Sequence, residues 1–278
     1  MSIFKSLALL TTAAVLLCVS AKSERGVADE VHPVLVDNCL IGGSINGKWM
    51  DAQAIAPRLK GGERYRLYTL RARSAGESTG GAPKALADYC SDTLEVELDP
   101  KPGEGTVLVV GGEWNAMPRA PQVLGNNEQV YKEATADILR RKRFRKPTIN
   151  ITRVLRVDLD GDGVEEVLVS AAHYEEGLGS ATHSMAIHAR AGDYSLVFLR
   201  KLIRGRVQNI VIDGEFYPSK ADEGGPPSQY IVAAVGDVDG DGTMEVVVRS
   251  DYYEGDASTI YSIKGDKATT LSSCACGA

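Results

Sequence analysis

A short acidic pattern that occurs twice constrains this chain more than any other feature. Residues 158–166 have the sequence DLDGDGVEE, and residues 237–245 have the sequence DVDGDGTME. Each copy is followed by a run of mostly β-branched residues, VLV at 167–169 and VVV at 246–248. Such runs favour strands. The sequence therefore predicts a repeated β unit in which an acidic loop leads into a strand.

The residue types in this pattern match the needs of a calcium ion. Calcium takes about six to eight oxygen ligands. Aspartates at alternate positions of a tight loop can turn their carboxylates inward, and the intervening glycines permit the sharp bends. The predicted ligands are Asp158, Asp160, Asp162, Val164 through its carbonyl, and Glu166 in the first loop, and Asp237, Asp239, Asp241, Thr243 and Glu245 in the second. The sequence thus predicts two calcium sites with a structural role.

Two alternatives to this interpretation are an EF-hand and a metal-free turn. An EF-hand requires a glutamate at the twelfth loop position and a helix on each side, whereas Val169 and Val248 stand at those positions. Asp-Gly turns without a metal are common. However, at least four carboxylates crowd each loop, and neither loop contains a lysine or arginine. This crowding favours a bound cation in both copies.

Each acidic loop is followed by further strand-like runs. In the first copy these runs cover residues 182–190 and 194–202, and in the second copy 259–264 and 267–272. With the strand before each loop, the count is about four strands per unit, which is the size of one propeller blade.

The loop pattern DxDGDGxxE, followed by a Val-rich strand, resembles the FG-GAP/VCBS repeat of integrin-α-like β-propellers. The resemblance covers residues 147–278 and implies calcium at the two ligand sets named above. The chain departs from that family because it lacks a Phe-Gly…Gly-Ala-Pro signature, has only two acidic loops and is too short for seven blades. The predicted fold class is therefore mainly β, a propeller-like or incomplete β-propeller assembly with one amphipathic helix.

The region before the repeats divides into two parts. Residues 22–125 are predicted to be rich in β structure, with strands at 62–70, 93–98 and 106–110. A run of Gly, Ser and Thr at 75–83 predicts an exposed loop.

Residues 126–146 are predicted to form a helix with a basic end. Val130, Ala134 and Ile138 recur at helical spacing, Asn126 or Asn127 is the expected N-cap, and a proline stops the helix at position 147. The dense basic run at 140–146 has two interpretations. It is either an anion-binding patch or a solvated helix end whose cations complement the helix dipole, and the second is favoured.

The N-terminus has the three-part pattern of a secretory signal peptide over residues 1–21. Lys5 precedes an apolar run at 7–19, and small residues follow up to Ala21. The alternative, a membrane anchor, requires about 20 apolar residues. A lipid anchor on Cys18 is disfavoured by the bulky Leu17 before it. We therefore expect a secreted or periplasmic protein without a transmembrane segment after cleavage.

Four cysteines remain after that cleavage, namely Cys39, Cys90, Cys274 and Cys276. An even number in an exported chain predicts disulfides, with three possible pairings. A bond between Cys39 and Cys90 would close a loop of about fifty residues. The sequence leaves the connectivity open.

The function indicated by these features is a non-catalytic binding or adhesion module stabilised by calcium. The formal net charge of −6 argues against nucleic acid as a partner, so the expected partner is an extracellular or envelope protein or a polysaccharide. No HExxH, GxSxG, P-loop or CxxC pattern is present. One alternative is a secreted polymer-degrading hydrolase or lyase, with Glu175 and Glu254 as a candidate acid/base pair. A third hypothesis is a periplasmic structural factor that uses the basic helix end. Trp49 and Trp114 either line a carbohydrate pocket or, as is favoured, pack in the core.

Overall fold

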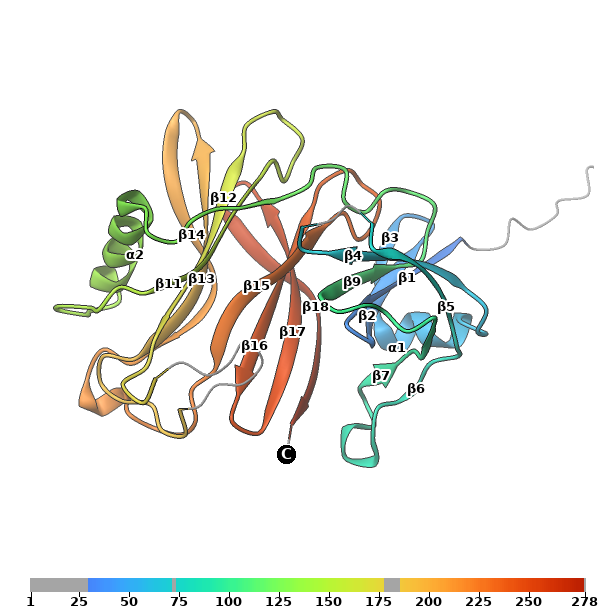
Figure 1. The fold of residues 1–278 in the computed structure, drawn as a ribbon, viewed down its shortest axis with the longest axis horizontal. Helices are drawn as coiled ribbons and strands as arrows, with labels where there is room; N and C mark the ends of the chain where they lie inside the picture. Colours follow the sequence, from blue (N-terminus) through green and yellow to red (C-terminus); the bar gives the residue numbers. More distant parts are fainter. Residues whose placement is uncertain (1–29, 72–73, 178–185, 278) are drawn as a thin grey trace, which may run out of the picture.

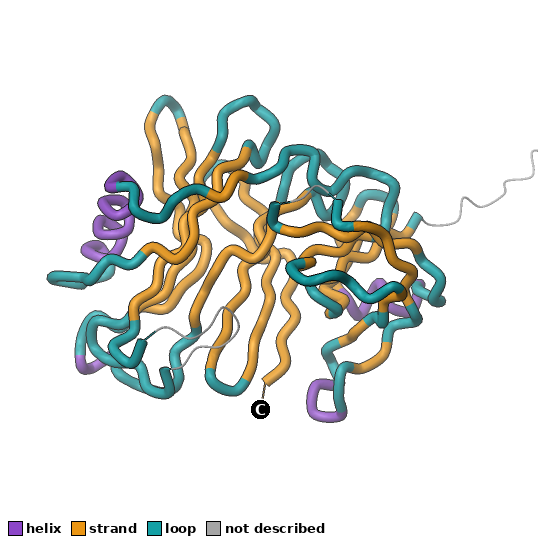
Figure 2. Tube along the Cα trace, in the orientation of Figure 1, coloured by secondary structure: helices purple, strands orange, loops and turns teal. Residues whose placement is uncertain are grey.

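Three antiparallel β-sheets make up the computed structural model of the chain (Figures 1 and 2). It describes residues 30–71, 74–177 and 186–277, so the predicted signal peptide at 1–21 lies outside the described residues. The fold is mainly β and consistent with an incomplete propeller, as predicted. Among the described residues, no helix has the length and apolar character needed to cross a membrane.

The N-terminal sheet curls into a half-barrel. Its strands are β1 (Val31–Val36), β2 (Cys39–Ile45), β3 (Lys48–Asp51), β4 (Arg64–Thr69), β5 (Gly76–Gly80), β6 (Lys84–Ala85), β7 (Leu94–Glu95), β8 (Leu98–Asp99) and β9 (Thr106–Val110). They follow the order β6-β7-β2-β1-β9-β4-β5-β8, and β3 pairs with β2. The short helices α1 (Ala52–Ile55), η1 (Ala56–Arg58) and η2 (Asp88–Cys90) connect them. Buried Leu35, Leu40, Tyr65 and Val109 fill the concave side.

The predicted loop at 75–83 is wrong in part, because β5 occupies Gly76–Gly80. Small residues are needed in this strand for packing rather than for a turn. The ring of Tyr65 lies where a side chain on Gly80 would project, and the hydroxyl of buried Ser78 donates to the carbonyl of Pro100 at 2.7 Å. The Gly- and Ser-rich composition of 75–83 therefore reflects the close contact of β5 with Tyr65 and Pro100.

The two repeat units form the other two sheets. The second sheet contains β10 (Gln122–Val123), β11 (Ile151–Val157), β12 (Glu166–His173), β13 (Tyr194–Ile203) and β14 (Arg206–Phe216). The third contains β15 (Gln229–Gly236), β16 (Glu245–Tyr252), β17 (Gly255–Lys264) and β18 (Lys267–Gly277), and the 3₁₀ turn η3 (Lys220–Asp222) precedes it. Apart from the short β10, each sheet is a four-stranded meander, which is the unit that the repeat predicts.

The strand predicted at 182–190 is not the third strand of the first unit. Part of that range lies outside the described residues, and residues 186–190 form only an isolated bridge between Ala189 and Gly224. The strand that pairs with β12 is β13. The first unit therefore has a long connection between its second and third strands, where the second unit has a short turn.

The predicted amphipathic helix is α2 (Gln129–Arg141), which covers the outer face of the second sheet (Figure 1). Its residues Ala134 and Ile138 pack against Val154 and Phe198 of that sheet. The predicted asparagine cap is wrong: the helix follows Glu128, and no side chain caps it. The side chain of Asn126 instead donates to the carbonyl of Ile151 at 3.1 Å.

One core joins all three sheets. A single cluster of buried residues includes Val34 of β1, Leu108 of β9, Leu168 of β12, Val235 of β15 and Val247 of β16. Strand β15 runs through the middle of the molecule, beside β9, β12 and β13 (Figure 1). This shared core fixes the position of the acidic loops relative to the N-terminal sheet.

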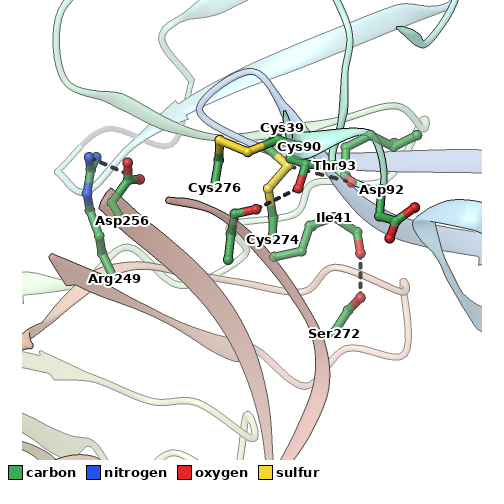
Figure 3. The surroundings of a disulfide bond; sticks show 12 residues. Cys39, Ile41, Cys90, Asp92, Thr93, Arg249, Asp256, Ser272, Cys274 and Cys276 are labelled. Atoms are coloured by element: carbon green, nitrogen blue, oxygen red, sulfur yellow. Dashed lines mark hydrogen bonds and ion pairs between the residues drawn. A yellow bond between two sulfur atoms is a disulfide. The ribbon is translucent and has the colours of Figure 1, made fainter. Parts of the chain in front are cut away.

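Two disulfides tie strand β18 to the N-terminal half (Figure 3). They join Cys39 to Cys274 and Cys90 to Cys276. Disulfide formation is thus confirmed, and the pairing of Cys39 with Cys90 does not occur. Cys274 and Cys276 are two positions apart on one strand and therefore point to the same side, which lets both reach the N-terminal cysteines.

Candidate metal centre

Both acidic loops are the bends of β-hairpins, as predicted. The first joins β11 to β12 and the second joins β15 to β16. In the first loop the carboxylate of Asp158 accepts from the backbone N–H groups of Gly161 at 2.7 Å and Gly163 at 3.1 Å. Both glycines have positive φ, 77° and 86°, which other residues adopt only with strain. The second loop repeats this arrangement around Asp237, with distances of 2.7 and 3.0 Å.

The last glutamate of each loop is folded under the bend. Glu166 accepts from the backbone N–H of Leu159 at 2.9 Å, and Glu245 accepts from that of Val238 at 3.2 Å. Each glutamate is only 2% exposed. Both loops therefore place a carboxylate in the interior, where its charge needs compensation.

The structure gathers three carboxylates in each loop. In each set, oxygen atoms from the three side chains lie within 4.8 Å of one another. The sets are Asp158, Asp160 and Glu166, and Asp237, Asp239 and Glu245. Asp162 and Asp241 instead accept from the backbone N–H groups of Val164 and Thr243, both at 2.7 Å. The three carboxylates of each set could hold a metal ion, and the roles of all ten predicted residues as ligands stay predictions.

In the first loop a lysine from the neighbouring strand contacts the carboxylates. The Lys201 ammonium donates to Asp160 at 2.5 Å and to Glu166 at 3.1 Å. Burial raises the pKa of Asp160, but the hydrogen bond and charge of Lys201 outweigh it and leave that pKa below its usual range. Burial alone would lower the pKa of Lys201. The hydrogen bonds and charges of Asp160 and Glu166 outweigh burial, so the pKa of Lys201 is raised. The first cluster is thus neutralised in part by the protein itself.

The second loop has no such partner. Among the ion pairs of the described residues, none joins a lysine or arginine to Asp237, Asp239 or Glu245. Burial raises the pKa of Glu245 to about 8, and the charges of Asp239 and its neighbours add to the effect. The pKa values of Asp237 and Asp239 are also raised, in both cases chiefly by burial. The charge of Lys264 lowers the pKa of Asp239 in part, but among the described residues no lysine or arginine contacts the second cluster as Lys201 contacts the first.

Two side chains from the segment before α2 donate hydrogen bonds to the backbone of the acidic loops. The Arg119 guanidinium donates to the carbonyls of Asp158 at 2.5 Å and Leu159 at 2.9 Å in the first loop, and to that of Gly242 at 2.8 Å in the second. The indole N–H of Trp114 donates to the carbonyl of Asp237 at 2.9 Å. Trp114, for which the sequence favours packing in the core over a carbohydrate pocket, packs against the core beside the second loop, and no local pattern in the sequence marks Arg119.

The other candidates lie elsewhere. Glu175 is 3.9 Å from Arg190, and Glu254 is exposed at the turn between β16 and β17. The basic end of α2 borders a cleft of about 930 Å³ whose lining includes Arg143 and Lys146 but also Glu175 and Asp222. The mixed charge of this cleft agrees with the favoured interpretation of a solvated helix end.

The donor chemistry of the second loop fits calcium. Carboxylate oxygens are hard ligands, and calcium accepts them in a flexible arrangement. Burial raises the pKa of Glu245 to about 8, so ionising this carboxyl in the folded chain costs free energy that a bound divalent cation would offset.

Comparison with known proteins agrees with this geometry. The sequence model of the FG-GAP repeat matches residues 230–263. The matched segment contains nearly all of β15, the second acidic loop, β16 and nearly all of β17, and the predicted resemblance is confirmed over this segment. No curated protein and no solved structure matches the chain.

Proposed function

We propose that this chain is an exported calcium-binding β-repeat protein that acts as a non-catalytic binding or adhesion module. The observation that carries the proposal is the second loop. There the segment that matches the FG-GAP model brings together the carboxylates of Asp237, Asp239 and the buried Glu245, and no lysine or arginine of the described residues forms an ion pair with them.

In the second loop, calcium would be held by Asp237, Asp239 and Glu245, with Asp241 and the carbonyl of Thr243 completing the set. In the first loop the corresponding ligands are Asp158, Asp160, Asp162, the carbonyl of Val164, and Glu166. The ion supplies positive charge that offsets carboxylate repulsion. The chain itself fixes the loop through its glycine bends and through Arg119.

Export is supported by the signal-like N-terminus and by the two disulfides, because such bonds persist mainly outside reducing compartments. The partner would then be an extracellular or envelope protein or a polysaccharide. Immobilised protein should retain such a partner from an envelope fraction in calcium and release it when chelator is added. Retention that ignores chelator would argue against a calcium-dependent module.

Calcium titration by calorimetry, combined with thermal unfolding, tests the metal site. A ligand that binds only the native state at about 100 times its Kd adds about 2.7 kcal/mol of stability. For a chain of this size we expect chelator to lower Tm by roughly 5–10 °C. Magnesium should restore less than calcium, because it demands stricter geometry. Identical unfolding curves in excess calcium and excess chelator would contradict the proposal.

A further inference from the structure

The Lys201 ammonium contacts two of the three carboxylates that make up the first cluster. Its distances are 2.5 Å to Asp160 and 3.1 Å to Glu166. The lysine side chain is 12% exposed, that of Glu166 is 2% exposed and that of Asp160 is 34% exposed, so the contact with Glu166 lies largely out of solvent. This is not a loose surface ion pair of the kind that contributes little.

Strand register shows that the second loop lacks the equivalent of this lysine. In the first unit Val167 of β12 lies opposite Arg200 of β13, and in the second unit Val246 of β16 lies opposite Tyr261 of β17. Continuing the register by one residue along each pair of strands places Glu166 opposite Lys201 and Glu245 opposite position 262. Position 262 is a buried serine. The repeat thus offers a natural pair of loops with and without a built-in cation.

An ammonium group and a divalent ion compete for the same oxygens. Calcium binds oxygen at about 2.3–2.6 Å, so an ion held by Asp160 and Glu166 would lie within a few ångströms of the Lys201 ammonium. Like charges at that separation repel strongly in a partly buried site, because solvent screens them less there than at the surface. The ammonium must therefore move away before the first loop can take calcium.

We propose that Lys201 acts as a tethered cation in the first loop, so that the two loops bind calcium with different affinities. The second loop is the high-affinity site, and the first is filled only when the lysine is displaced. This inference rests on the proposed function, because it assumes that the second loop binds calcium. It adds that two loops of closely similar sequence bind calcium with different affinities.

Exchanging the two residues tests the inference. Calorimetry on the native chain should show one tight calcium site. Lys201→Ser, which copies the second loop, should tighten the first site by about tenfold or more, so that two tight sites are counted. Ser262→Lys, which copies the first loop, should remove the tight site. Lys201→Gln keeps the length without the charge and serves as a second variant should the serine variant fail to fold.

Terbium, a luminescent ion that replaces calcium, identifies which loop is filled. Trp114 lies beside the second loop, with its indole N–H 2.9 Å from the carbonyl oxygen of Asp237. Excitation of Trp114 should therefore sensitise terbium in that loop. The emission should persist in Lys201→Ser and be lost in Ser262→Lys.

The outcomes separate this inference from the proposed function. Two equally tight sites in the native chain, unchanged in Lys201→Ser and Lys201→Gln, would overturn the role of Lys201 and leave the calcium function standing. Absence of calcium binding in the native chain would overturn the proposed function and this inference with it. One tight site that becomes two on removal of the lysine charge supports both.

Discussion

The two acidic loops have nearly the same sequence and the same backbone hydrogen bonds, yet their electrostatics differ. In the first loop, Lys201 of β13 contacts Asp160 and Glu166. In the second loop, Glu245 is equally buried, and its pKa is raised to about 8. The nine residues of the pattern set the backbone shape, and a residue on the neighbouring strand sets the charge. A loop motif therefore predicts a geometry, while its surroundings decide how strongly it needs an ion.

The largest expected difference between the two loops comes from replacing the buried glutamate of each, Glu166 or Glu245, by glutamine. At about pH 9 in chelator, Glu166→Gln should lower the free energy of unfolding by about 3 kcal/mol, because Lys201 loses a buried partner. Glu245→Gln should instead raise it by about 1 kcal/mol, because at that pH the substitution removes an ionised buried carboxylate, whose pKa is about 8.

Urea unfolding of both variants in chelator measures these changes. In calcium the sign for Glu245→Gln should reverse, since the variant loses a ligand. A loss of similar size in both variants under chelator would mean that the loops are equivalent.

A smaller effect is expected at the residue that contacts both loops. Arg119→Ala removes the guanidinium that donates to the carbonyls of Asp158, Leu159 and Gly242. We expect a loss of about 2 kcal/mol, because hydrogen bonds from a charged donor are stronger than neutral ones. The matched control is Arg64→Ala, which breaks only an exposed ion pair with Glu77 and should change stability by less than about 0.5 kcal/mol. Equal losses in the two variants would rule out a bracing role for Arg119.

The smallest effect is a pH dependence that belongs to the second loop alone. The pKa of Glu245 rises from 4.5 to about 8 on folding. The folded chain therefore holds this proton more tightly than the unfolded chain, and stability falls as pH rises from about 5 to about 8. We expect a loss of about 1 kcal/mol or more in chelator, absent in Glu245→Gln and in excess calcium. In the first loop, Asp160 has a lowered pKa and Lys201 a raised one, so their titration lies outside this window. Thermal unfolding across pH provides the measurement, and a flat profile in chelator would contradict the raised pKa.

The acidic loops could be predicted from sequence because they are local. Alternating Asp and Gly fix a bend within a few residues, and the Val-rich runs after them specify strands. The apolar stripe of helix α2 could be predicted too, because its residues recur every three or four positions along the chain. These features depend on neighbours in the chain, which the sequence displays directly.

What could not be predicted depends on contacts between distant segments. Lys201 meets Glu166 through the register of β12 and β13, and the long connection before β13 hides that register from a repeat alignment. Arg119 and the second loop are likewise far apart in sequence. The cysteine pairing was open for the same reason, since three connectivities satisfy the same composition.

The disulfides have a consequence for what a protease can do to the chain. The bonds Cys39–Cys274 and Cys90–Cys276 span 235 and 186 residues. A single backbone nick anywhere between Cys39 and Cys276 therefore leaves both pieces covalently attached. A clipped molecule would run as one band on a non-reducing gel and as two after reduction, and its acidic loops would stay joined to the half-barrel that supports them.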